Sequence, residues 1–461
     1  MTPNLAASAA PPPGRPATTP RPPTAVGAPA LAGRTAVVTA PLGSSTVTGR
    51  VPGAGSAVRR GRFSRTPARM RLAAFVGMLA SVLVAVVGLA AGLGQSNALA
   101  SAADDTTQQV RALEVRNDLV AADATATNAF LVGGREPVVQ RARYDQSLVD
   151  ATAGLVEVAG VDRGDAGRLA PVSTAVATYS GLVEQARANN RQGFPVGAAY
   201  LETASQELRA SALPGIDEVV DANDRAVSDA FAGAGRALVA LLVVVLGLVV
   251  IVAVQVWLAG RTHRRLNGGL VLATGALLAG GILLAGGLNG GRDTAGDVRD
   301  GPYARTVAVA RAYSLANDAK AMESFTLIKR GSGQAYEEAY VAAVDEARGL
   351  LAVPGVDPRV VETFDAWTAT HSEIRDLDDG GDWDGAVALA TSDAADSPNA
   401  RFDAFGEAAQ EAVAAQGAQA DSALHDAARS SSRGAWVALV AGLAAAVCVA
   451  VGFSARLKEY R

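Results

Sequence analysis

The chain has 461 residues, of which 49% are hydrophobic and 19% charged, with a formal net charge of −4. This small total hides an uneven distribution: residues 1–71 hold ten arginines and no acid, residues 95–235 hold 19 acids and 11 arginines, and residues 289–433 hold 25 acids and 13 basic residues. The only cysteine, Cys448, excludes an intrachain disulfide and a cysteine-based metal site, so both acidic segments must fold by packing alone.

Residues 1–71 are predicted to form a disordered, basic cytoplasmic tail. The first 58 residues are rich in Pro, Ala, Thr and Gly, a composition that cannot bury a core. The cluster RRGRFSRTPARMR at 59–71 then places six arginines directly before an apolar run. We interpret the cluster as a topology signal, and a phosphorylation-controlled contact with the membrane through Ser64 and Thr66 is the alternative.

Four apolar segments are long enough to cross a bilayer, which takes about 20 helical residues. They are residues 72–93, 237–258, 270–288 and 435–455, and none contains Asp, Glu, Lys or Arg. One charge at the membrane centre would cost about 2.5–3.5 kcal/mol, so this composition predicts four transmembrane helices rather than core helices of a soluble protein. Translation from Met70 would instead make the first segment a signal peptide cleaved after ALA at 98–100, but the long leader favours an uncleaved helix.

The distribution of basic residues predicts the orientation, because cytoplasmic flanks of membrane spans carry an excess of Lys and Arg. The tail at 52–71, the loop at 259–269 and the carboxyl end at 456–461 together hold 12 basic residues in about 37 positions. The flanks of the two acidic segments hold eight in about 80 positions. Both termini and the loop are therefore predicted to be cytoplasmic, and residues 94–236 and 289–434 extracytoplasmic.

Each extracytoplasmic segment is predicted to form a helical bundle, because helix formers dominate and strand-like alternation is missing. Turn signals divide the first segment at 133–137, 160–165, 189–195 and 213–215, and the second at KRGSG, PGVDP, DDGGD and DSPN. Helices with short connections favour an up-and-down bundle whose first and last helices continue into the spans. Alanine-rich cores would bury little area per residue, which predicts modest stability.

The two halves of the chain match each other in sequence, which predicts that the bundles are duplicated. DATATNAF begins at Asp123 and DAKAMESF at Asp318, an offset of 195 positions. The same offset relates Val149-Asp150 to Val344-Asp345, Gly154-Leu155 to Gly349-Leu350, and Gly160-Val161-Asp162 to Gly355-Val356-Asp357.

Small residues recur along two of the spans. They are Gly434, Ala438, Gly442, Ala446 and Ala450 in the last span, and Ala276, Gly280, Gly281 and Ala285 in the third. Such faces let membrane helices approach closely, so we predict specific helix association here, with an alanine-rich composition as the alternative explanation.

The chain carries no recognisable catalytic or metal-binding pattern. The three histidines, His263, His371 and His425, lie singly and are interpreted as isolated surface residues. The acidic run DLDDGGDWDG at 376–385 lacks the bidentate glutamate of a calcium-binding EF-hand loop, because the twelfth position from Asp376 is Val387. GxxxxGK[ST] and GxSxG motifs are absent. We therefore expect no enzyme activity, no cofactor and no bound metal.

The stretch ARANNRQGFPVGAAYLETASQELR at 186–209, the closing SARLKEYR at 454–461 and the paired outer segments resemble the GlnX-like four-span membrane adaptors of the actinobacterial amino-acid-sensing kinase system. The resemblance covers residues 70–461. It implies an adaptor that senses glutamate or aspartate through a solute-binding lipoprotein outside the membrane and signals toward a cytoplasmic Ser/Thr kinase. More loosely, each half is similar to the four-helix-bundle sensor modules of chemoreceptors and histidine kinases.

The predicted fold is an all-α integral membrane protein with four transmembrane helices and two duplicated extracytoplasmic helical bundles. The predicted function is a membrane signalling adaptor that relays extracytoplasmic amino-acid or solute-binding-protein occupancy to a Ser/Thr kinase or other cytoplasmic output protein. A transporter or permease subunit and a structural envelope protein are the alternatives, although Gln255 and Thr274 are among the few polar residues in the spans. The lipid bilayer is an expected partner, nucleic acid is not, and a homo-oligomer is left open.

Partner binding is predicted at an exposed turn of the first bundle. Asn190, Arg191, Phe194 and Tyr200 bring amide, guanidinium and aromatic groups to this turn, a combination that can recognise another protein. The competing interpretation is a helix-joining turn with Phe194 and Tyr200 buried.

Overall fold

The computed structural model of the chain describes residues 66–134, 136–161, 163–193, 195–236, 240–262 and 267–458. The predicted tail up to residue 65, the basic loop residues 263–266 and residues 459–461 lie outside the described residues. The contacts divide the chain into two units, residues 1–59 and 60–461, and only the second is described below. Every regular element in the described part of this unit is helical, which confirms the predicted all-α class.

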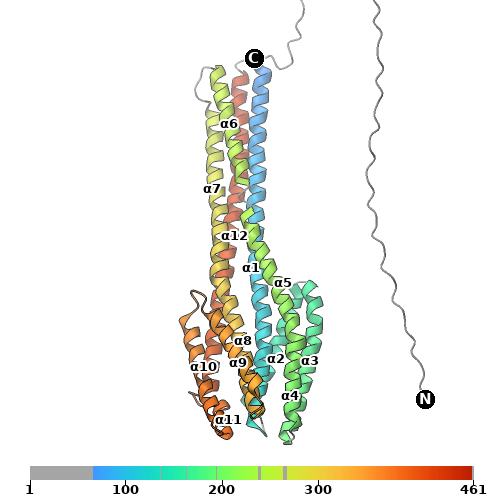
Figure 1. The fold of residues 1–461 in the computed structure, drawn as a ribbon. Coiled ribbons are helices and arrows are strands. Elements are labelled where there is room, and N and C mark those ends of the chain that lie inside the picture. Colours follow the sequence, from blue (N-terminus) through green and yellow to red (C-terminus); the bar gives the residue numbers. More distant parts are fainter. Residues whose placement is uncertain are drawn as a thin grey trace, which may run out of the picture. The chain divides into compact units, whose positions relative to one another are not determined.

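The first half of the unit consists of one very long helix and a bundle built around its distal part. Helix α1 (Thr66–Val132) runs without interruption through the first apolar segment to the tip of the bundle (Figure 1). The chain then forms α2 (Val138–Val161), α3 (Arg163–Arg191), α4 (Val196–Glu207), the π-helical turn η1 (Leu208–Ala212), α5 (Leu213–Arg236) and α6 (Ala240–Thr262). Gly133 and Gly134 reverse the chain after α1 with φ values of +68° and +59°, a conformation that favours glycine.

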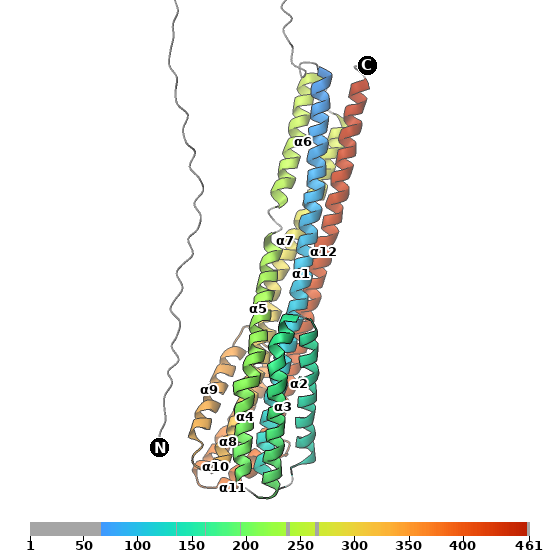
Figure 2. The same cartoon turned by 90° about the vertical axis from the view of Figure 1, so that its right-hand side faces the viewer.

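The second half follows a similar course. Its elements are α7 (Gly268–Val298), the π-helical turn η3 (Arg299–Tyr303), α8 (Ala304–Ile328), α9 (Gln334–Leu351), α10 (Pro358–Asp379), α11 (Trp383–Ala390) and α12 (Pro398–Lys458). Helices α7 and α8 meet at a kink, where Gly301 leaves the helical conformation immediately before Pro302. Helix α12 is 61 residues long and passes from the bundle into the last apolar segment without a break (Figure 2).

One predicted turn is wrong. LPG at 213–215 does not end a helix, because α4, η1 and α5 follow one another directly from Val196 to Arg236. Pro214 cannot donate a backbone hydrogen bond, and the π-helical turn at Leu208–Ala212 lies immediately before it. The widened turn shifts the hydrogen-bond register, so the helix continues past a residue that usually stops it.

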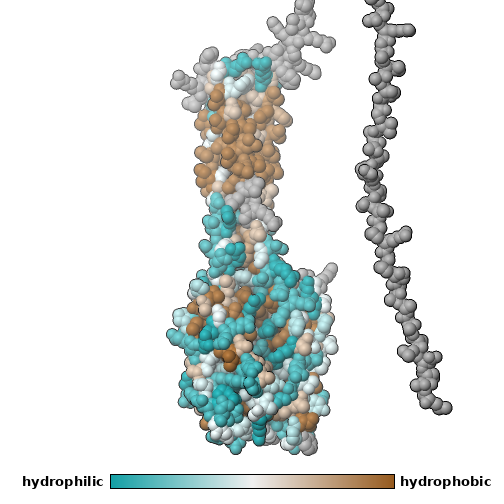
Figure 3. Space-filling model, in the orientation of Figure 1, coloured by the Kyte–Doolittle hydropathy of each residue, from teal (hydrophilic) through white to brown (hydrophobic). Residues whose placement is uncertain are grey.

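Four helices of the described residues are long and apolar enough to cross a membrane, as predicted. The apolar windows lie in Ala68–Val132, Ala240–Arg261, Gly268–Ile328 and Pro398–Ala455, with mean hydropathies of 2.6, 3.0, 2.0 and 2.4. Their outward-facing apolar side chains form a belt on the face shown in Figure 3, while the bundles carry a mostly polar surface there. The chain is therefore a multi-pass membrane protein by length and composition of its helices. We call the belt the apolar end and the rest the bundle region.

The small residues of the last span lie against α1 and α7, and of the five predicted positions Gly434, Ala438 and Gly442 are buried. The buried positions of α12 in the apolar end are Ser431, Gly434, Ala435, Ala438, Gly442, Ala445, Val449, Gly452 and Phe453. Apart from the neighbouring pairs at 434–435 and 452–453, these positions are three or four residues apart, the heptad spacing of packed helices, and the predicted Ala446 and Ala450 are only half-buried. A strict four-residue repeat drifts around a helix with 3.6 residues per turn, and the heptad keeps one seam against its partner.

We expect Gly442→Leu to separate α1 from α12. A Cβ atom at Gly442 would lie 2.6 Å from the Cβ of Ala85 and 2.9 Å from the backbone oxygen of Ser81, both on α1. Overpacking of this kind costs about 1–3 kcal/mol, so the thermal unfolding midpoint of the detergent-solubilised protein should fall. Gly275→Leu is the matched control, because a Cβ there meets no atom within 4 Å. Equal midpoints for the two variants would contradict the contact.

The largest apolar core of the bundle region is shared by both bundles. Buried residues of the first bundle, such as Leu119 and Tyr179, belong to the same cluster as Phe325 and Trp367 of the second. Alanines fill much of the contact between α1 and α8, as predicted from composition. The second bundle departs from that prediction, because Trp367 packs within 6.2 Å, centroid to centroid, of Phe364, Phe402 and Phe405. Aromatic side chains bury far more area each than alanine, so this half of the core is the better stabilised.

The predicted duplication stays a prediction, but the burial pattern refines its register. In α2 and α9 the equivalent buried residues are Tyr144 and Tyr340, Ala151 and Ala347, and Leu155 and Leu351. Each pair is 196 positions apart, one more than the offset that relates Asp123 to Asp318. The ungapped match therefore pairs an exposed residue, Val149, with the buried Val344.

Candidate functional site

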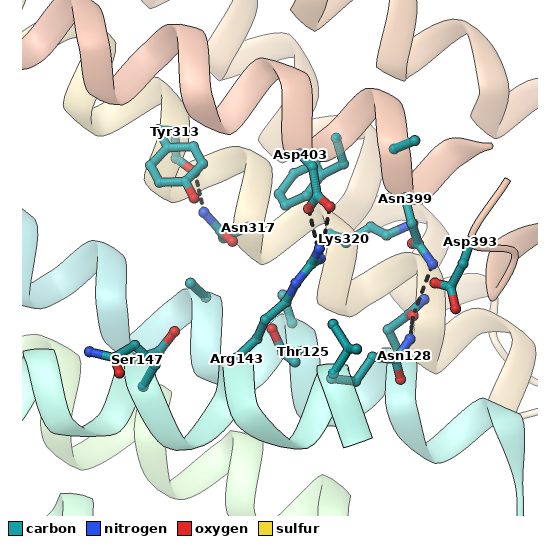
Figure 4. A pocket seen from close by; sticks show the side chains of 17 residues that line it. Thr125, Asn128, Arg143, Ser147, Tyr313, Asn317, Lys320, Asp393, Asn399 and Asp403 are labelled. Atoms are coloured by element: carbon teal, nitrogen blue, oxygen red, sulfur yellow. Dashed lines mark hydrogen bonds and ion pairs between the residues drawn. The ribbon is translucent and has the colours of Figure 1, made fainter. Parts of the chain in front are cut away.

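A cavity of about 520 Å³ lies where the two bundles meet. Helices α1 and α2 form one wall, while α8, α12 and the connection before α12 form the other (Figure 4). Its charged lining residues are Arg143, Lys320, Asp393 and Asp403. A volume of about 300–1,000 Å³ is typical of small-molecule sites, so this cavity can hold a metabolite-sized ligand. We call it the inter-bundle cavity.

An ion pair crosses the mouth of the inter-bundle cavity. Arg143 of α2 reaches Asp403 of α12, with 2.8 Å between Nη1 and Oδ2 (Figure 4). Both side chains are about half exposed, at 53% and 41%. Exposed pairs contribute about 0–1 kcal/mol, so this bridge can open at little cost when a ligand enters.

Amide side chains line the end of the cavity near the bundle tip. Asn128 of α1 donates to the backbone oxygen of Ala390 at 3.0 Å, and its own Oδ1 accepts from Gln140 Nε2 at 3.2 Å and from Asn399 Nδ2 at 3.4 Å. Asn128 therefore connects α1 to α2, α11 and α12. A shift of any of these helices would change its hydrogen bonds.

A chain of buried charges leads away from the cavity into the second bundle. Lys320 is 3% exposed and its Nζ donates to Glu323 Oε1 at 2.6 Å. Glu323 Oε2 lies 2.9 Å from His371 Nδ1, and His371 Nε2 lies 3.0 Å from Glu337 Oε1. Arg375 Nε lies 3.7 Å from Glu337 Oε2. Three helices, α8, α9 and α10, are thus joined by alternating charges.

The charged groups of this buried series stabilise one another's ionised forms. Burial alone would raise the pKa of Glu323, but the charges and hydrogen bonds of Lys320 and His371 outweigh it and hold the pKa at about 2. Burial alone would lower the pKa of His371, yet its hydrogen bonds to Glu323 and Glu337 raise it above the ordinary value. His371 also stacks on Tyr340, with 3.6 Å between ring centroids.

The interpretation of His371 as an isolated surface histidine is wrong. The residue is 7% exposed and lies between two carboxylates that are 48 and 34 positions away in the sequence. Local spacing could not reveal partners on two other helices. His425 fits the prediction better, because its side chain is 41% exposed, and His263 lies outside the described residues.

We expect the stability of the bundle region to decline as the pH rises through the raised pKa of His371. The folded chain binds the His371 proton more tightly than the unfolded chain does. The resulting stabilisation is present in full below the ordinary pKa of 6.5 and is lost as the pH passes the folded value. Unfolding midpoints measured from about pH 6 to about pH 9 should fall for the native protein and fall less for His371→Gln, with His425→Gln as the matched control. A slope unchanged by His371→Gln would contradict this assignment.

A second buried charge cluster holds the two bundles together. Arg209 donates to Asp123 Oδ2 at 2.8 Å and to Asp318 Oδ1 at 3.0 Å, so one guanidinium contacts a carboxylate from each bundle. Asp123 is fully buried and also accepts a hydrogen bond from Ser205 at 2.6 Å. Burial raises the pKa of Asp318, and the Arg209 charge opposes this shift. Asp123 and Asp318 are the residues that open the two matching sequence stretches, and the fold brings them to the same arginine.

Three of the predicted partner-binding residues, Asn190, Arg191 and Tyr200, lie at the tip of the first bundle and do not line the inter-bundle cavity. Asn190 and Arg191 line a second cavity of about 470 Å³ between α1, α2, α3 and α4. Asn190 donates to the backbone oxygen of Phe130 at 3.1 Å, which fixes the end of α3 to the end of α1. Tyr200 is half-buried against the core, and Phe194 lies outside the described residues.

The charged residues of the inter-bundle cavity were not predicted from the sequence. Lys320 offered one signal, because it is one of three lysines in the whole chain and stands in an acidic segment three positions before Glu323. The acidic run at 376–385 forms a helix–helix turn, where Asp382 caps α11 by accepting from the backbone nitrogen of Gly385. Within the described ranges, no group of three or more His, Cys, Asp or Glu side chains is placed to hold a metal ion.

The first bundle resembles a known family. Residues 98–232 match the model of a family described as an actinobacterial sensor domain, and this range runs from the bundle part of α1 nearly to the end of α5. No curated protein matches the chain. The family match supports a sensing role for a protein of actinobacterial type and favours a non-catalytic one.

Proposed function

We propose that this protein is a membrane signalling adaptor that relays binding events in its bundle region to a cytoplasmic output protein such as a Ser/Thr kinase. The observation that carries the proposal is the continuity of α1 and α12, which both line the inter-bundle cavity and both pass unbroken through the apolar end. At about 1.5 Å per residue, α1 is roughly 100 Å long. A helix of this kind can transmit a small shift or rotation from the cavity to its other end, provided that the ligand distinguishes two arrangements of the bundle.

The proposed orientation places the bundle region outside the cell and both termini inside. The beginning of α1, the end of α6, the beginning of α7 and the end of α12 lie at the same end of the described unit (Figure 1). This arrangement supports placing the four flanks on one side, and the positive-inside rule assigns arginine-rich flanks to the cytoplasm. In intact cells, a thiol reagent should label a cysteine placed at the exposed position 149 at once. A cysteine at the buried position 371 should react only after unfolding. Labelling of a cysteine at position 263 instead of position 149 would overturn the orientation.

A polar contact joins α1, α5, α7 and α12 where the spans leave the apolar end. Gln95 of α1 is 1% exposed, and its Nε2 donates to the backbone oxygens of Ala234 in α5 and Leu288 in α7, each at 2.8 Å. Ser431 of α12 donates to Gln95 Oε1 at 2.9 Å. Movement of one long helix against the others must break this contact, so it supports a concerted change rather than independent motions.

The extracytoplasmic partner in this proposal is a solute-binding lipoprotein that docks on the tip of the first bundle. Asn190, Arg191, Phe194 and Tyr200 are the proposed contact residues, and Arg191 is exposed. Arg191→Glu and Tyr200→Ala should reduce co-purification of the lipoprotein from mild detergent. Arg359→Glu, on the exposed surface of the second bundle, is the matched control. Unchanged co-purification in the first two variants would remove this docking site.

The relay itself can be tested by locking the helices. Ala98 of α1 and Gly233 of α5 approach so closely that their Cβ atoms would be 3.5 Å apart, which suits a disulfide. The test uses the Ala98→Cys/Gly233→Cys protein in a Cys448→Ala background. When the disulfide is formed, phosphorylation by the kinase should no longer respond to the extracytoplasmic partner. After the disulfide is reduced, the response should return. Each single cysteine variant is a control. A normal response in the oxidised protein would overturn the relay.

The transporter alternative has less support from the apolar end. Gln255 of α6 donates to Thr274 Oγ1 of α7 at 2.7 Å and to the backbone oxygen of Leu270 at 2.6 Å. These polar side chains satisfy each other across a helix contact instead of facing a substrate route. Solute uptake into vesicles that contain this protein alone would favour the transporter.

A further inference from the structure

We propose that the inter-bundle cavity binds a small solute that presents a carboxylate together with a hydrogen-bond donor, the carboxylate facing Lys320 and the donor facing Gln140. This assignment deepens the proposed function by naming the ligand of its sensing site, and it rests on that function only for the consequence of binding. Binding itself is measurable without any signalling partner.

The first argument is the unused hydrogen-bonding capacity of Lys320. An ammonium group has three donors, and among the described residues Lys320 has one hydrogen-bond partner, Glu323. Its side chain is 4% exposed, so bulk water cannot readily take the other two donors. A buried charge with unmet donors is costly, and an acceptor supplied by a ligand in the cavity would remove that cost.

The second argument is an acceptor without a donor. Gln140 is 7% exposed, and its Nε2 is used by Asn128, but its Oε1 has no hydrogen-bond partner. Unsatisfied buried side-chain oxygens are rare in folded proteins. Lys320 and Gln140 border the same cavity from opposite bundles, so one ligand with an acceptor group and a donor group satisfies both.

The third argument is the local charge balance. The carboxylate of Glu323 faces Lys320 and also lies 2.9 Å from His371. On the other side of His371, Glu337 is also near Arg375. With His371 protonated, two cations share the charge of Glu323, which leaves the part of the cavity beside Lys320 attractive to an anion, while Asp393 in the same lining favours the donor end of the ligand. Arg143 at the mouth, with its exposed partner Asp403, can turn toward the same anion.

The ligand would join the two bundles. Gln140 belongs to α2, packed against α1, and Lys320 belongs to α8, packed close to α12. A ligand that contacts both bundles therefore lowers the free energy of one relative arrangement of the bundles more than that of another. This is the differential interaction that a sensor requires, and it connects the cavity to the helices that reach the apolar end.

Calorimetric titration of the full-length protein in mild detergent tests the assignment. The probes are lactate, with a hydroxyl donor, and β-alanine, with an ammonium donor; lactamide is the control probe because it lacks the carboxylate. We expect saturable binding of at least one carboxylate probe in the millimolar range and at least tenfold weaker binding of lactamide. Equal binding of lactate and lactamide, or no saturable binding of either carboxylate, would overturn the ligand class.

Two variants locate the binding event. Ser147→Phe fills the cavity from its half-buried wall without changing a charge, and should weaken probe binding at least tenfold while leaving the unfolding midpoint near the native one. Lys320→Met should abolish binding, but it also leaves Glu323 with one partner fewer, so Ser147→Phe keeps the test decisive if that variant fails to fold. Lys329→Met is the matched control: this lysine pairs with Glu202 at 2.6 Å and does not line the cavity. Native binding by Ser147→Phe would overturn the site.

Failure of this inference is distinguishable from failure of the relay. If the probes do not bind but the oxidised Ala98→Cys/Gly233→Cys protein loses its response, the relay stands and the ligand is of another class. If the probes bind as expected and the lock has no effect, the cavity stands and the relay is wrong.

Discussion

Replacing Arg209 with methionine lowers the free energy of unfolding of the bundle region by about 3–5 kcal/mol, the cost of leaving a buried charge without its partner. Asp123 is fully buried, and its Oδ2 depends on Arg209 and Ser205 for hydrogen bonds. Asp318 loses one of the two cations, Arg209 and Arg116, that oppose the burial-driven rise of its pKa. The measurement is chemical denaturation in mild detergent, followed by tryptophan fluorescence of the second bundle.

Two further variants separate the charge from its geometry. Arg209→Lys should recover only part of the stability, because one ammonium cannot contact two carboxylates as a planar guanidinium does. Arg359→Met is the control, since its pair with Glu411 is exposed at 64% and 67% and should change the free energy by about 0–1 kcal/mol. A loss for Arg209→Met as small as that of the control would show that the cluster does not hold the bundles together.

Replacing Glu323 with alanine should also cost about 3–5 kcal/mol, because this carboxylate is the one that Lys320 and His371 share in the core of the second bundle. The side chain is 1% exposed, so water cannot readily replace it. The pKa of His371 should fall as well, since Glu323 is among the groups that raise it. Denaturation experiments at two pH values measure both effects in the same protein.

The control for this variant is Glu362→Ala, which removes an exposed carboxylate from α10 and should change stability by less than about 0.5 kcal/mol. Glu323→Gln should lie between the two, since the amide can still accept a hydrogen bond from Lys320 but carries no charge. If Glu323→Ala were as stable as Glu362→Ala, the buried charge chain would not stabilise the bundle.

The membrane architecture was predictable because its cause is local. Hydrocarbon cannot satisfy backbone polar groups, so each span must be a continuous apolar helix and can be recognised from its own residues. Most turns were predictable for a similar reason, since Gly331, Gly355 and Gly381 adopt positive φ values that other residues avoid. LPG failed as a turn signal because the preceding π-helical turn absorbs the effect of Pro214.

The candidate site was not predictable, because it depends on contacts between distant segments. Asn128 meets Asn399 across 271 positions, and Arg143 meets Asp403 across 260. A shift of one residue between the halves, from an offset of 195 at Asp123 to 196 at Tyr144, decides which side chains of α2 and α9 point into the core. No local pattern reports such a shift.

The residues by themselves determined that this protein is helical, that four helices suit a bilayer, and that its arginines gather on the flanks of those helices, since hydrophobicity and charge act along the chain. Only the tertiary structure decided that the two bundles share one core, that Asp123 and Asp318 meet at Arg209, and that Lys320 and Gln140 face one cavity. The physical reason is that burying a charge or an amide is tolerable only with a partner, and in this fold the partners are distant in the sequence, some of them, such as Asp318 for Arg209 and Asn399 for Asn128, in the opposite half of the chain.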